Sequence, residues 1–330
     1  MRTRALRNGL ALTELGLGTA QFGNLYRETT DEEAFGAAEA AWDAGVRYFD
    51  TAPHYGLGLS ERRLGSYLAT KPRDEFVISS KVGRLLVPSP ETATEQDDEG
   101  FAVPAAVRRV WDFSREGILR SVDATLERTG LDRLDIAYLH DPDDHLEQAF
   151  GEGIEALIEL RAQGVVRAVG AGMNQAAALA ELIRRADVDV VMVAGRFSLL
   201  DQEAAQALLP LAAERQVGVV VAGVYNSGLL SSPRPAQNAK YDYQDAPAAL
   251  VERARAIAEV CERHGVTLPD AAVAFPLLDP AVVSVVVGAR TPAQVDGNVA
   301  RYQARIPDAL WGDLRSAALL PAVAPSRDRI

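Results

Sequence analysis

Four polar side chains in the first half of the chain have the types that proton transfer requires. Asp50, Lys81 and His140 each end a short apolar run, and Tyr55 lies five residues beyond Asp50 in a loop that contains proline and glycine. A phenol has an unperturbed pKa of about 10, so it needs a neighbouring cation before it can exchange its proton near neutral pH. The first question is therefore whether the fold brings a cation to Tyr55.

Lys81 is the cation that the sequence offers. As an ammonium close to the phenol, it would stabilise the phenolate and lower the pKa of Tyr55. Asp50 would pair with Lys81 and keep it charged in a partly buried site. His140 could hold a carbonyl or hydroxyl oxygen in line and share the proton movement. Such a site, without a metal or a covalent nucleophile, suits reversible carbonyl–alcohol chemistry in which a cofactor carries the hydride.

Each of these residues also has a structural explanation when it is taken alone. An aspartate before a loop often forms a turn or a cap. A lone tyrosine usually packs, a lysine at a strand end is usually solvated, and a lone histidine more often satisfies the backbone. The catalytic interpretation rests on all four occurring together at matched strand ends.

The elements that must position these side chains are predicted by the alternation of short apolar runs with longer amphipathic stretches. We expect strands at residues 15–18, 46–50, 76–81, 135–140, 168–171, 188–193, 218–222 and 282–287. We expect helices near residues 31–44, 60–69, 114–129, 151–163, 176–185, 201–215, 247–264 and 292–304, with an extra helix at 308–318. This pattern predicts an α/β fold with a parallel sheet that is buried on both faces. Eight such units favour a closed (β/α)8 TIM barrel over an open sheet with a second domain, and a barrel works at the C-terminal ends of its strands.

The expected organisation is one barrel domain over residues 1–330, with its core at about 10–302 and an extra helix and tail over 303–330. Two segments, 83–113 and 225–246, are too long and polar to be simple connections. Both follow strands, so we expect them to overhang the catalytic face as lids or pocket walls. The alternative is that they are disordered surface loops.

Composition narrows the classes of partner. The formal charge of −12 argues against nucleic acid or an anionic membrane surface as the main partner. The single cysteine, Cys261, excludes a disulfide framework and fits a reducing, cytoplasmic setting. No apolar run approaches the ~18 residues of a membrane span. The chain has four histidines and no metal-ligand motif, so no bound metal is expected. The glycines at 16, 18 and 23 do not have the spacing of the dinucleotide-binding motif G-x-G-x-x-G, so a Rossmann-type nucleotide site is not expected there.

Several stretches of the chain resemble the aldo-keto reductases. They are 15–19 (LGLGT), 45–52 (GVRYFDTA) with Tyr55-Gly56 and Ser60-Glu61, Ser80-Lys81, 131–135 (LDRLD) leading to Leu139-His140, and 287–292 (VGARTP) with Gln294 and Asn298. The resemblance covers about residues 10–302 and implies a (β/α)8 barrel that binds an extended NAD(P) at its C-terminal face. Asp50, Tyr55, Lys81 and His140 fall on the catalytic tetrad of that family. The resemblance assigns the role of general acid/base to Tyr55.

The same resemblance implies the contacts with cofactor and substrate. The cofactor residues would be Gly18, Thr19, Asp50, Asn174, Tyr225, Asn226, Gly228, Gly288, Ala289, Arg290, Gln294 and Asn298. The substrate residues would be Tyr55, His140, Arg84 and Trp111.

Three positions depart from the commoner pattern of the family. Gly172-Met173-Asn174 stands where a Ser-Asn pair is usual, and Val193-Ala194-Gly195 lacks the usual glutamine. Tyr225, three residues beyond Ala222, is the one substitute for a tyrosine that stacks on the nicotinamide.

These departures, together with residues 81–85 and 225–230, resemble a narrower branch of the family. That branch includes L-fucose, D-threo-aldose and L-galactose dehydrogenases and pyridoxal 4-dehydrogenase, and its sugar dehydrogenases oxidise a cyclic hemiacetal at the anomeric carbon to a lactone. The leading expectation is therefore an aldose 1-dehydrogenase of carbohydrate metabolism that acts on a small sugar or aldehyde. The alternatives are a pyridoxal 4-dehydrogenase, a general NADPH-dependent carbonyl reductase, and a non-enzymatic, nucleotide-sensing partner subunit.

The choice of cofactor depends on cations near the adenosine ribose, because a 2′-phosphate needs lysine or arginine. Many NADPH-using members have a Lys-Ser pair where this chain has Gly288-Ala289, and an arginine where Gln294 stands. Arg290 remains as the nearby cation, and its alternative role is that of a solvated residue at a helix start. We expect NAD, with NADP tolerated.

Overall fold

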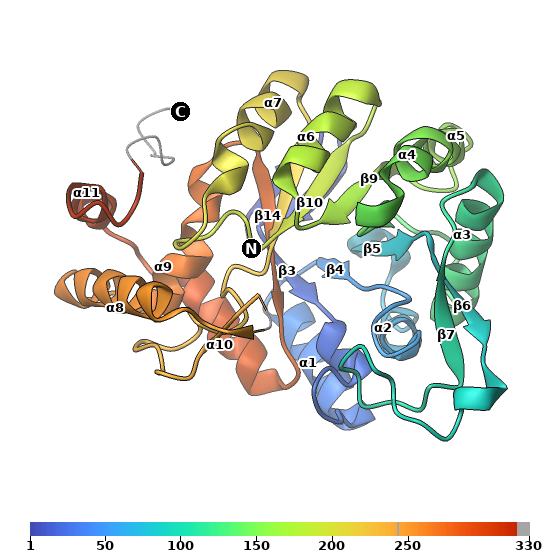
Figure 1. The fold of residues 1–330 in the computed structure, drawn as a ribbon, viewed down its shortest axis with the longest axis horizontal. Coiled ribbons are helices and arrows are strands. Elements are labelled where there is room, and N and C mark those ends of the chain that lie inside the picture. The colour runs from blue at the N-terminus through green and yellow to red at the C-terminus, as the bar shows by residue number, and fades with distance from the viewer. Residues whose placement is uncertain (243, 322–330) are drawn as a thin grey trace.

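Eight parallel strands close into a barrel that is surrounded by helices (Figure 1). The computed structural model describes residues 1–242 and 244–321. In chain order the barrel strands are β3 (Leu15–Gly18), β4 (Tyr48–Asp50), β5 (Val77–Val82), β8 (Ile136–His140), β9 (Ala168–Met173), β10 (Val190–Ala194), β11 (Gly218–Ala222) and β14 (Val282–Gly288). Chain neighbours pair throughout, and β14 closes the barrel by pairing with β3. The predicted (β/α)8 barrel is confirmed.

The predicted helices alternate with these strands. They are α1 (Asp31–Asp43), α2 (Leu59–Leu68), α3 (Arg115–Thr129), α5 (Ile154–Ala162), α6 (Ala176–Arg185), α7 (Leu208–Arg215), α8 (Ala248–Arg263) and α10 (Pro292–Gln303). The start of α1 is fixed locally by a capping box, in which Thr30 and Glu33 each accept a hydrogen bond from the other's backbone N–H. The extra helix expected beyond the barrel is α11 (Asp308–Ser316). Residues 322–330 of the expected tail lie outside the described residues.

Several elements differ from the sequence-based prediction, and α7 begins at Leu208 rather than at residue 201. A hairpin of β1 (Thr3–Ala5) and β2 (Ala11–Thr13) precedes the barrel, and a short helix, α9 (Leu268–Ala274), lies between α8 and β14. The strand β4 begins at Tyr48 rather than at residue 46. The hairpin strands have three residues each and α9 has seven, so they are too short to establish a periodic pattern in the sequence.

The core has two parts. The larger part fills the space between the barrel and its helices, where small side chains such as Ala37, Ala38 and Ala41 of α1 let the helix approach the strands. The smaller part includes Leu6, Leu10 and Leu12 and buried strand residues such as Tyr138. The N-terminal segment therefore packs against one end of the barrel core, which leaves the other end for chemistry.

The two long segments carry local structure of their own. Segment 83–113 contains the antiparallel strands β6 (Arg84–Pro88) and β7 (Val107–Trp111), and segment 225–246 contains the short strands β12 (Lys240–Tyr241) and β13 (Gln244–Asp245). They begin after β5 and β11, so both leave the barrel at the C-terminal ends of its strands.

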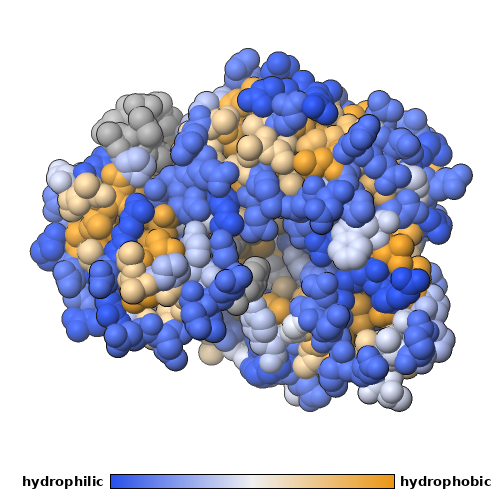
Figure 2. Space-filling view, in the orientation of Figure 1, coloured by the Kyte–Doolittle hydropathy of each residue, from blue (hydrophilic) through white to orange (hydrophobic). Residues whose placement is uncertain are grey.

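The surface agrees with the acidic, polar composition. Figure 2 shows a face that is mostly hydrophilic, with smaller hydrophobic patches. Among the described helices, none combines the length and the apolar character that crossing a membrane requires.

Candidate active site

The strand ends bring the four expected catalytic side chains together. Lys81 is 3% exposed, and its ammonium lies 2.7 Å from Asp50 Oδ2 and 2.9 Å from the carbonyl oxygen of Thr51. The ammonium nitrogen lies 4.8 Å from the centre of the Tyr55 ring. The rings of Tyr55 and His140 meet edge to face with centroids 6.1 Å apart. The carboxylate, phenol, ammonium and imidazole thus converge at one point of the barrel mouth.

A buried polar chain beneath the site holds Asp50. Ser79 Oγ donates to Asp50 Oδ1 at 2.7 Å, and the same hydroxyl lies 3.0 Å from the hydroxyl of Tyr48. The hydroxyl of Tyr138 continues the chain, 3.3 Å from that of Tyr48. Sequence reasoning missed these three supporting residues. Their signal was a hydroxyl two residues before Asp50, Lys81 and His140 on each strand, because alternate strand residues point to the same side.

The electrostatics keep Lys81 charged and Tyr55 protonated. Burial lowers the pKa of Lys81, but Asp50 and Tyr55 raise it by more, so its pKa lies above the usual value. Burial is the largest influence and raises the pKa of Tyr55; Lys81 lowers it, and the carboxylates of Asp50 and Asp141 raise it further. The pKa of Tyr55 is therefore raised overall, whereas the sequence predicted that it would be lowered. Lys81 acts in the predicted direction, but burial outweighs it.

His140 is neutral in this environment. Burial lowers its pKa well below the usual value, and the nearby cations Arg84 and Lys81 add to the effect. Its Nδ1 is buried without a hydrogen-bond partner in the described part of the chain, and its Nε2 lies 3.4 Å from Asp141 Oδ2. His54 packs against His140 with ring centroids 5.6 Å apart, and burial lowers the pKa of His54 to about 2. An uncharged imidazole can donate one hydrogen bond to a substrate oxygen.

Segment 83–113 forms a wall beside the phenol. Phe101 is buried and its ring lies 6.2 Å from that of Tyr55 and 5.2 Å from that of His54. Arg109 donates to the carbonyl oxygen of His54 at 3.0 Å and makes a buried ion pair with Asp97 at 2.5 Å. The wall is thus tied to the loop that carries Tyr55.

The two residues expected to contact substrate, Arg84 and Trp111, face each other across the β6–β7 hairpin. The guanidinium carbon of Arg84 lies 5.4 Å from the centre of the Trp111 ring. Arg84 also donates to Asp141 Oδ2 at 2.7 Å, which places it on the His140 side of the site. Trp111 is 39% exposed and lies at the outer edge of this pair.

At the other side of the barrel mouth, Gly18 pairs with both Asp50 and Gly288. A Cβ on Gly288 would come within 2.6 Å of the side-chain amide of Gln21, whose Oε1 is buried without a hydrogen-bond partner in the described part of the chain. Thr19, in contrast, uses its hydroxyl internally, donating to the carbonyl oxygen of Asp50 at 2.8 Å. Gly288 therefore lets the side chain of Gln21 lie close to the backbone of β14, and Gln21 brings an acceptor without a hydrogen-bond partner in the described residues.

Two asparagines gather around Gly195. Asn174 donates to the carbonyl oxygen of Ala194 at 3.0 Å, and Asn226 donates to that of Gly195 at 3.2 Å. The Oδ1 atom of Asn226 is buried without a partner in the described chain. Gly228 follows with a φ of +94°, a left-handed conformation that favours glycine. The structure thus places Asn174 and Asn226 together, as the cofactor assignment requires.

The hydroxyl of Tyr225 is hydrogen-bonded to two side chains of α10. It donates to Asn298 Oδ1 at 3.0 Å and accepts a hydrogen bond from Arg301 at 3.0 Å. Asn298 in turn reaches the carbonyl oxygen of Gly288 at 3.4 Å. Hydrogen bonds therefore connect Tyr225, Asn298 and Gly288, three of the expected cofactor residues. They also include Arg301, which the sequence did not indicate because only the fold brings α10 close to the loop after β11.

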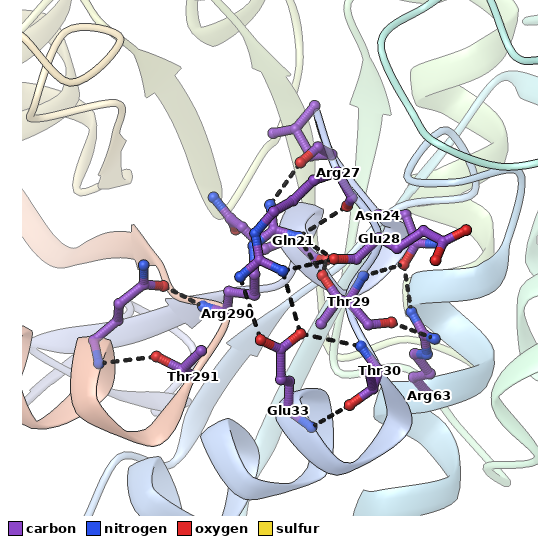
Figure 3. A network of polar contacts seen from close by, with 12 residues as sticks. Gln21, Asn24, Arg27, Glu28, Thr29, Thr30, Glu33, Arg63, Arg290 and Thr291 are labelled. Atoms are coloured by element: carbon purple, nitrogen blue, oxygen red, sulfur yellow. Dashed lines mark hydrogen bonds and ion pairs between the residues drawn. The ribbon is translucent and has the colours of Figure 1, made fainter.

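Arg290 is neither solvated nor free (Figure 3). Its side chain is 7% exposed, and its guanidinium donates to the carbonyl oxygens of Leu25 at 2.6 Å and Arg27 at 2.9 Å and to the hydroxyl of Thr29. The side chain of Gln294 accepts a hydrogen bond from the backbone N–H of Arg290 at 2.8 Å. Ala289, between Gly288 and Arg290, is buried. The guanidinium expected near the adenosine ribose is thus engaged by the turn after β3.

Comparisons with known proteins agree with this fold and site. Residues 14–318 match the model of the aldo/keto reductase family, so the chain belongs to that family. Over 316 residues, covering 95% of this chain and 96% of the relative, it is 50% identical to a D-threo-aldose 1-dehydrogenase from a Pseudomonas species. It is 40% identical to a pyridoxal 4-dehydrogenase from Microbacterium luteolum, covering 96% of this chain and 97% of the relative. The solved structure of an aldo-keto reductase from Bacillus halodurans has a TM-score of 0.76 at 26% identity, covering 98% of this chain and 97% of that one.

Family membership confirms the resemblance and shows that the protein is an oxidoreductase that uses NAD(P)H. The residues present fit such a cofactor, because the unpartnered acceptors of Gln21 and Asn226 and the exposed residue Gly288 lie at neighbouring strand ends. Among the described residues, no cluster of three or more His, Cys, Asp or Glu has the arrangement of a metal site.

Proposed function

We propose that this protein is an NAD-dependent aldose 1-dehydrogenase that oxidises a sugar hemiacetal, of the L-fucose or D-threo-aldose type, at C1 to the lactone. The observation that carries this proposal is the contact of Tyr55 with the Lys81–Asp50 ion pair, where the ammonium lies 4.8 Å from the ring centre. The 50% identity to a D-threo-aldose 1-dehydrogenase supports the substrate class.

In the proposed mechanism, this chain's residues move the proton. A nicotinamide held at the neighbouring strand ends would supply the acceptor for the hydride that leaves C1. Neutral His140 donates from Nε2 to the C1 oxygen and orients it, and the phenolate of Tyr55 removes the C1 hydroxyl proton. Lys81 stabilises that phenolate, and Asp50 holds Lys81 in place through the 2.7 Å contact. The electron pair of the broken O–H bond forms the carbonyl bond of the lactone.

The cofactor is proposed to be NAD because the cation expected near the adenosine ribose is engaged elsewhere. Arg290 donates to Leu25, Arg27 and Thr29, and Gly288 and Gln294 carry no charge. A 2′-phosphate would therefore find the Arg290 guanidinium already bonded, and the neighbouring Arg27 paired with Glu33 at 3.3 Å. The test is kcat/KM with NAD and with NADP, and we expect NAD to be preferred. A strong preference for NADP would contradict the assignment.

A panel of sugars and aldehydes, assayed with NAD and NADP by NADH or NADPH absorbance, tests the activity. Oxidation of a sugar hemiacetal is the expected result. Pyridoxal is included because the 40% identity to a pyridoxal 4-dehydrogenase makes it the second candidate. Turnover of simple aldehydes with NADPH alone would indicate a general reductase. Tight cofactor binding without any turnover would indicate a nucleotide-sensing subunit.

A further inference from the structure

Asp141 has a left-handed backbone conformation, which is uncommon among residues other than glycine. It follows His140 at the end of β8 with a φ of +37°, in the left-handed region. Its N–H donates to the carbonyl oxygen of Gly172 at 3.0 Å, which ties the turn to β9. A non-glycine residue in this region carries a conformational cost, and such residues gather at functional sites where the surroundings hold them.

The carboxylate of Asp141 stands beside the proposed catalytic imidazole. Its Oδ2 accepts a hydrogen bond from Arg84 at 2.7 Å and lies 3.4 Å from His140 Nε2. The side chain of Asp141 is 32% exposed, whereas those of His140 and Arg84 are 5% and 11% exposed. Of the three side chains, that of Asp141 is thus the most exposed, and those of His140 and Arg84 are mostly buried.

Arg84 holds the carboxylate from a fixed position. Its guanidinium lies over the ring of Trp111, 5.4 Å from the ring centre, on the β6–β7 hairpin. This contact and the 2.7 Å hydrogen bond leave Asp141 little freedom. A charged carboxylate accepts hydrogen bonds and donates none. The arrangement therefore presents a fixed acceptor directly beside the nitrogen that would hold the substrate oxygen.

We propose that Asp141 is a substrate-binding residue that accepts a hydrogen bond from the hydroxyl on the carbon next to the oxidised one, and that Arg84 is its positioning residue. This inference rests on the proposed function, in which His140 Nε2 holds the C1 oxygen. The neighbouring hydroxyl then lies on the side of Asp141 Oδ2. A substrate without that hydroxyl leaves the carboxylate unpaired and binds less well. The site thereby selects 2-hydroxy aldehydes and sugars over simple aldehydes.

The test compares matched substrates rather than absolute rates. Asp141→Gly removes the carboxylate and keeps the left-handed φ accessible, and Asp141→Asn keeps the shape without the charge. The readout is the ratio of kcat/KM for a sugar hemiacetal to that for its 2-deoxy analogue. In Asp141→Gly this ratio should fall by about 10- to 100-fold, the effect of losing a hydrogen bond to a charged group. Asp144→Asn, a nearby exposed aspartate, is the control and should leave the ratio unchanged.

A second substrate pair separates this proposal from the proposed function. Glycolaldehyde and acetaldehyde, reduced with NADH, differ by the same neighbouring hydroxyl and require no sugar activity. If no sugar is oxidised, the proposed function fails while this pair still tests Asp141. NADH binding by fluorescence identifies a variant that does not fold. Asp141→Asn then replaces Asp141→Gly, with a smaller expected fall in the ratio because its amide oxygen still accepts a hydrogen bond but carries no charge. Equal losses on both members of a pair would show that Asp141 merely positions His140 and would overturn the proposal.

Discussion

At the scale of single residues, the pKa of Tyr55 is set by burial, by the ammonium of Lys81 and by the carboxylates of Asp50 and Asp141. Burial raises the pKa of Tyr55, and Lys81 opposes that shift without cancelling it. Lys81 stays charged because Asp50 and Tyr55 outweigh its own desolvation. The phenol is thus held as an acid beside a cation that would stabilise its conjugate base. A general acid/base that must act in both directions benefits from such an arrangement.

Replacing Tyr55 by phenylalanine tests the proton carrier directly. Tyr55→Phe keeps the ring that packs against Phe101 and removes the hydroxyl. We expect turnover to fall by roughly 10²–10⁴-fold, the usual contribution of a general acid/base. NADH binding, followed by fluorescence, should be retained and serves as the control. Near-normal turnover would show that the assignment of Tyr55 is wrong.

The pH dependence of oxidation should follow Tyr55 and not His140. Below the pKa of Tyr55 the phenol is protonated and cannot accept the substrate proton, so kcat/KM for oxidation should rise as the pH increases. Because the pKa of Tyr55 is raised, the rise should lie on the alkaline side. His140 should add no inflection near its ordinary pKa of about 6.5, since its pKa is well below that value.

Lys81→Met supplies the matched comparison for that profile. Removing the ammonium removes the influence that lowers the pKa of Tyr55, so the alkaline limb should move to higher pH and the rate at neutral pH should fall. The measurement is kcat/KM for oxidation across the pH range for both proteins. An unchanged midpoint in Lys81→Met would argue that Lys81 does not act on Tyr55.

At the scale of elements, two arginines hold the turn between β3 and α1 by hydrogen bonds (Figure 3). Arg290, before α10, donates to Leu25, Arg27 and Thr29, as described above. From α2, Arg63 donates to the carbonyl oxygens of Phe22 at 2.7 Å and Thr29 at 2.8 Å. The segment that lies beside Gly288 is thereby held from both sides.

The same turn is joined to the wall over the phenol. The backbone N–H of Ala102 donates to the carbonyl oxygen of Asn24 at 2.9 Å, and the side chain of Asn24 donates back to Ala102 at 3.1 Å. Phe101, next to Ala102, packs on Tyr55. A continuous set of hydrogen bonds therefore links the proposed cofactor segment to the wall of the site.

Arg290→Met tests whether Arg290 is a structural clamp. Losing the guanidinium removes the donor to the buried Thr29 hydroxyl and to the part-buried carbonyl oxygens of Leu25 and Arg27, which should lower the free energy of unfolding by about 1–3 kcal/mol. Urea unfolding measures this change, and Arg27→Met, at an exposed side chain, should have little effect. An unchanged stability together with a selective loss of NADP use would instead make Arg290 a phosphate ligand.

At the scale of the whole molecule, the barrel includes positions where the backbones of two neighbouring strands lie so close that only glycine fits. A Cβ on Gly170 of β9 would lie 1.7 Å from the carbonyl oxygen of Val190, at the boundary with β10. Because every barrel strand has two partners, a displacement at this boundary is passed to the neighbouring strand ends. The position is therefore a sensitive test of barrel integrity.

Gly170→Ala should lower the free energy of unfolding by about 1–3 kcal/mol or more, since an added methyl group in a filled space forces the backbone to shift. Gly312→Ala is the matched control, because a Cβ there would meet nothing within 4 Å in α11. That change should stabilise the protein by about 0.5–1 kcal/mol through helix propensity. Urea unfolding of both variants measures whether the free energy of unfolding changes in opposite directions. An unchanged free energy of unfolding in Gly170→Ala would contradict the close contact.

The order of elements could be predicted because its determinants are local. The start of α1 follows from the capping box of Thr30 and Glu33, and the strand ends follow from apolar runs that stop at Asp50, Lys81 and His140. The convergence of those three residues then follows from the parallel barrel, because neighbouring strand ends lie ~5 Å apart. The β1–β2 hairpin and α9 were missed because elements of three to seven residues carry no periodic signal.

By itself, the sequence determined the barrel, the family and the side chains that meet at its mouth, because periodicity and motif spacing are properties of the chain. The tertiary structure alone decided the net direction of the Tyr55 pKa, the engagement of Arg290 by the turn at 25–29 and the approach of Arg84 to Asp141. Each of these depends on burial or on partners distant along the chain. Such effects arise only when separate segments are brought together, so no local pattern of residues records them.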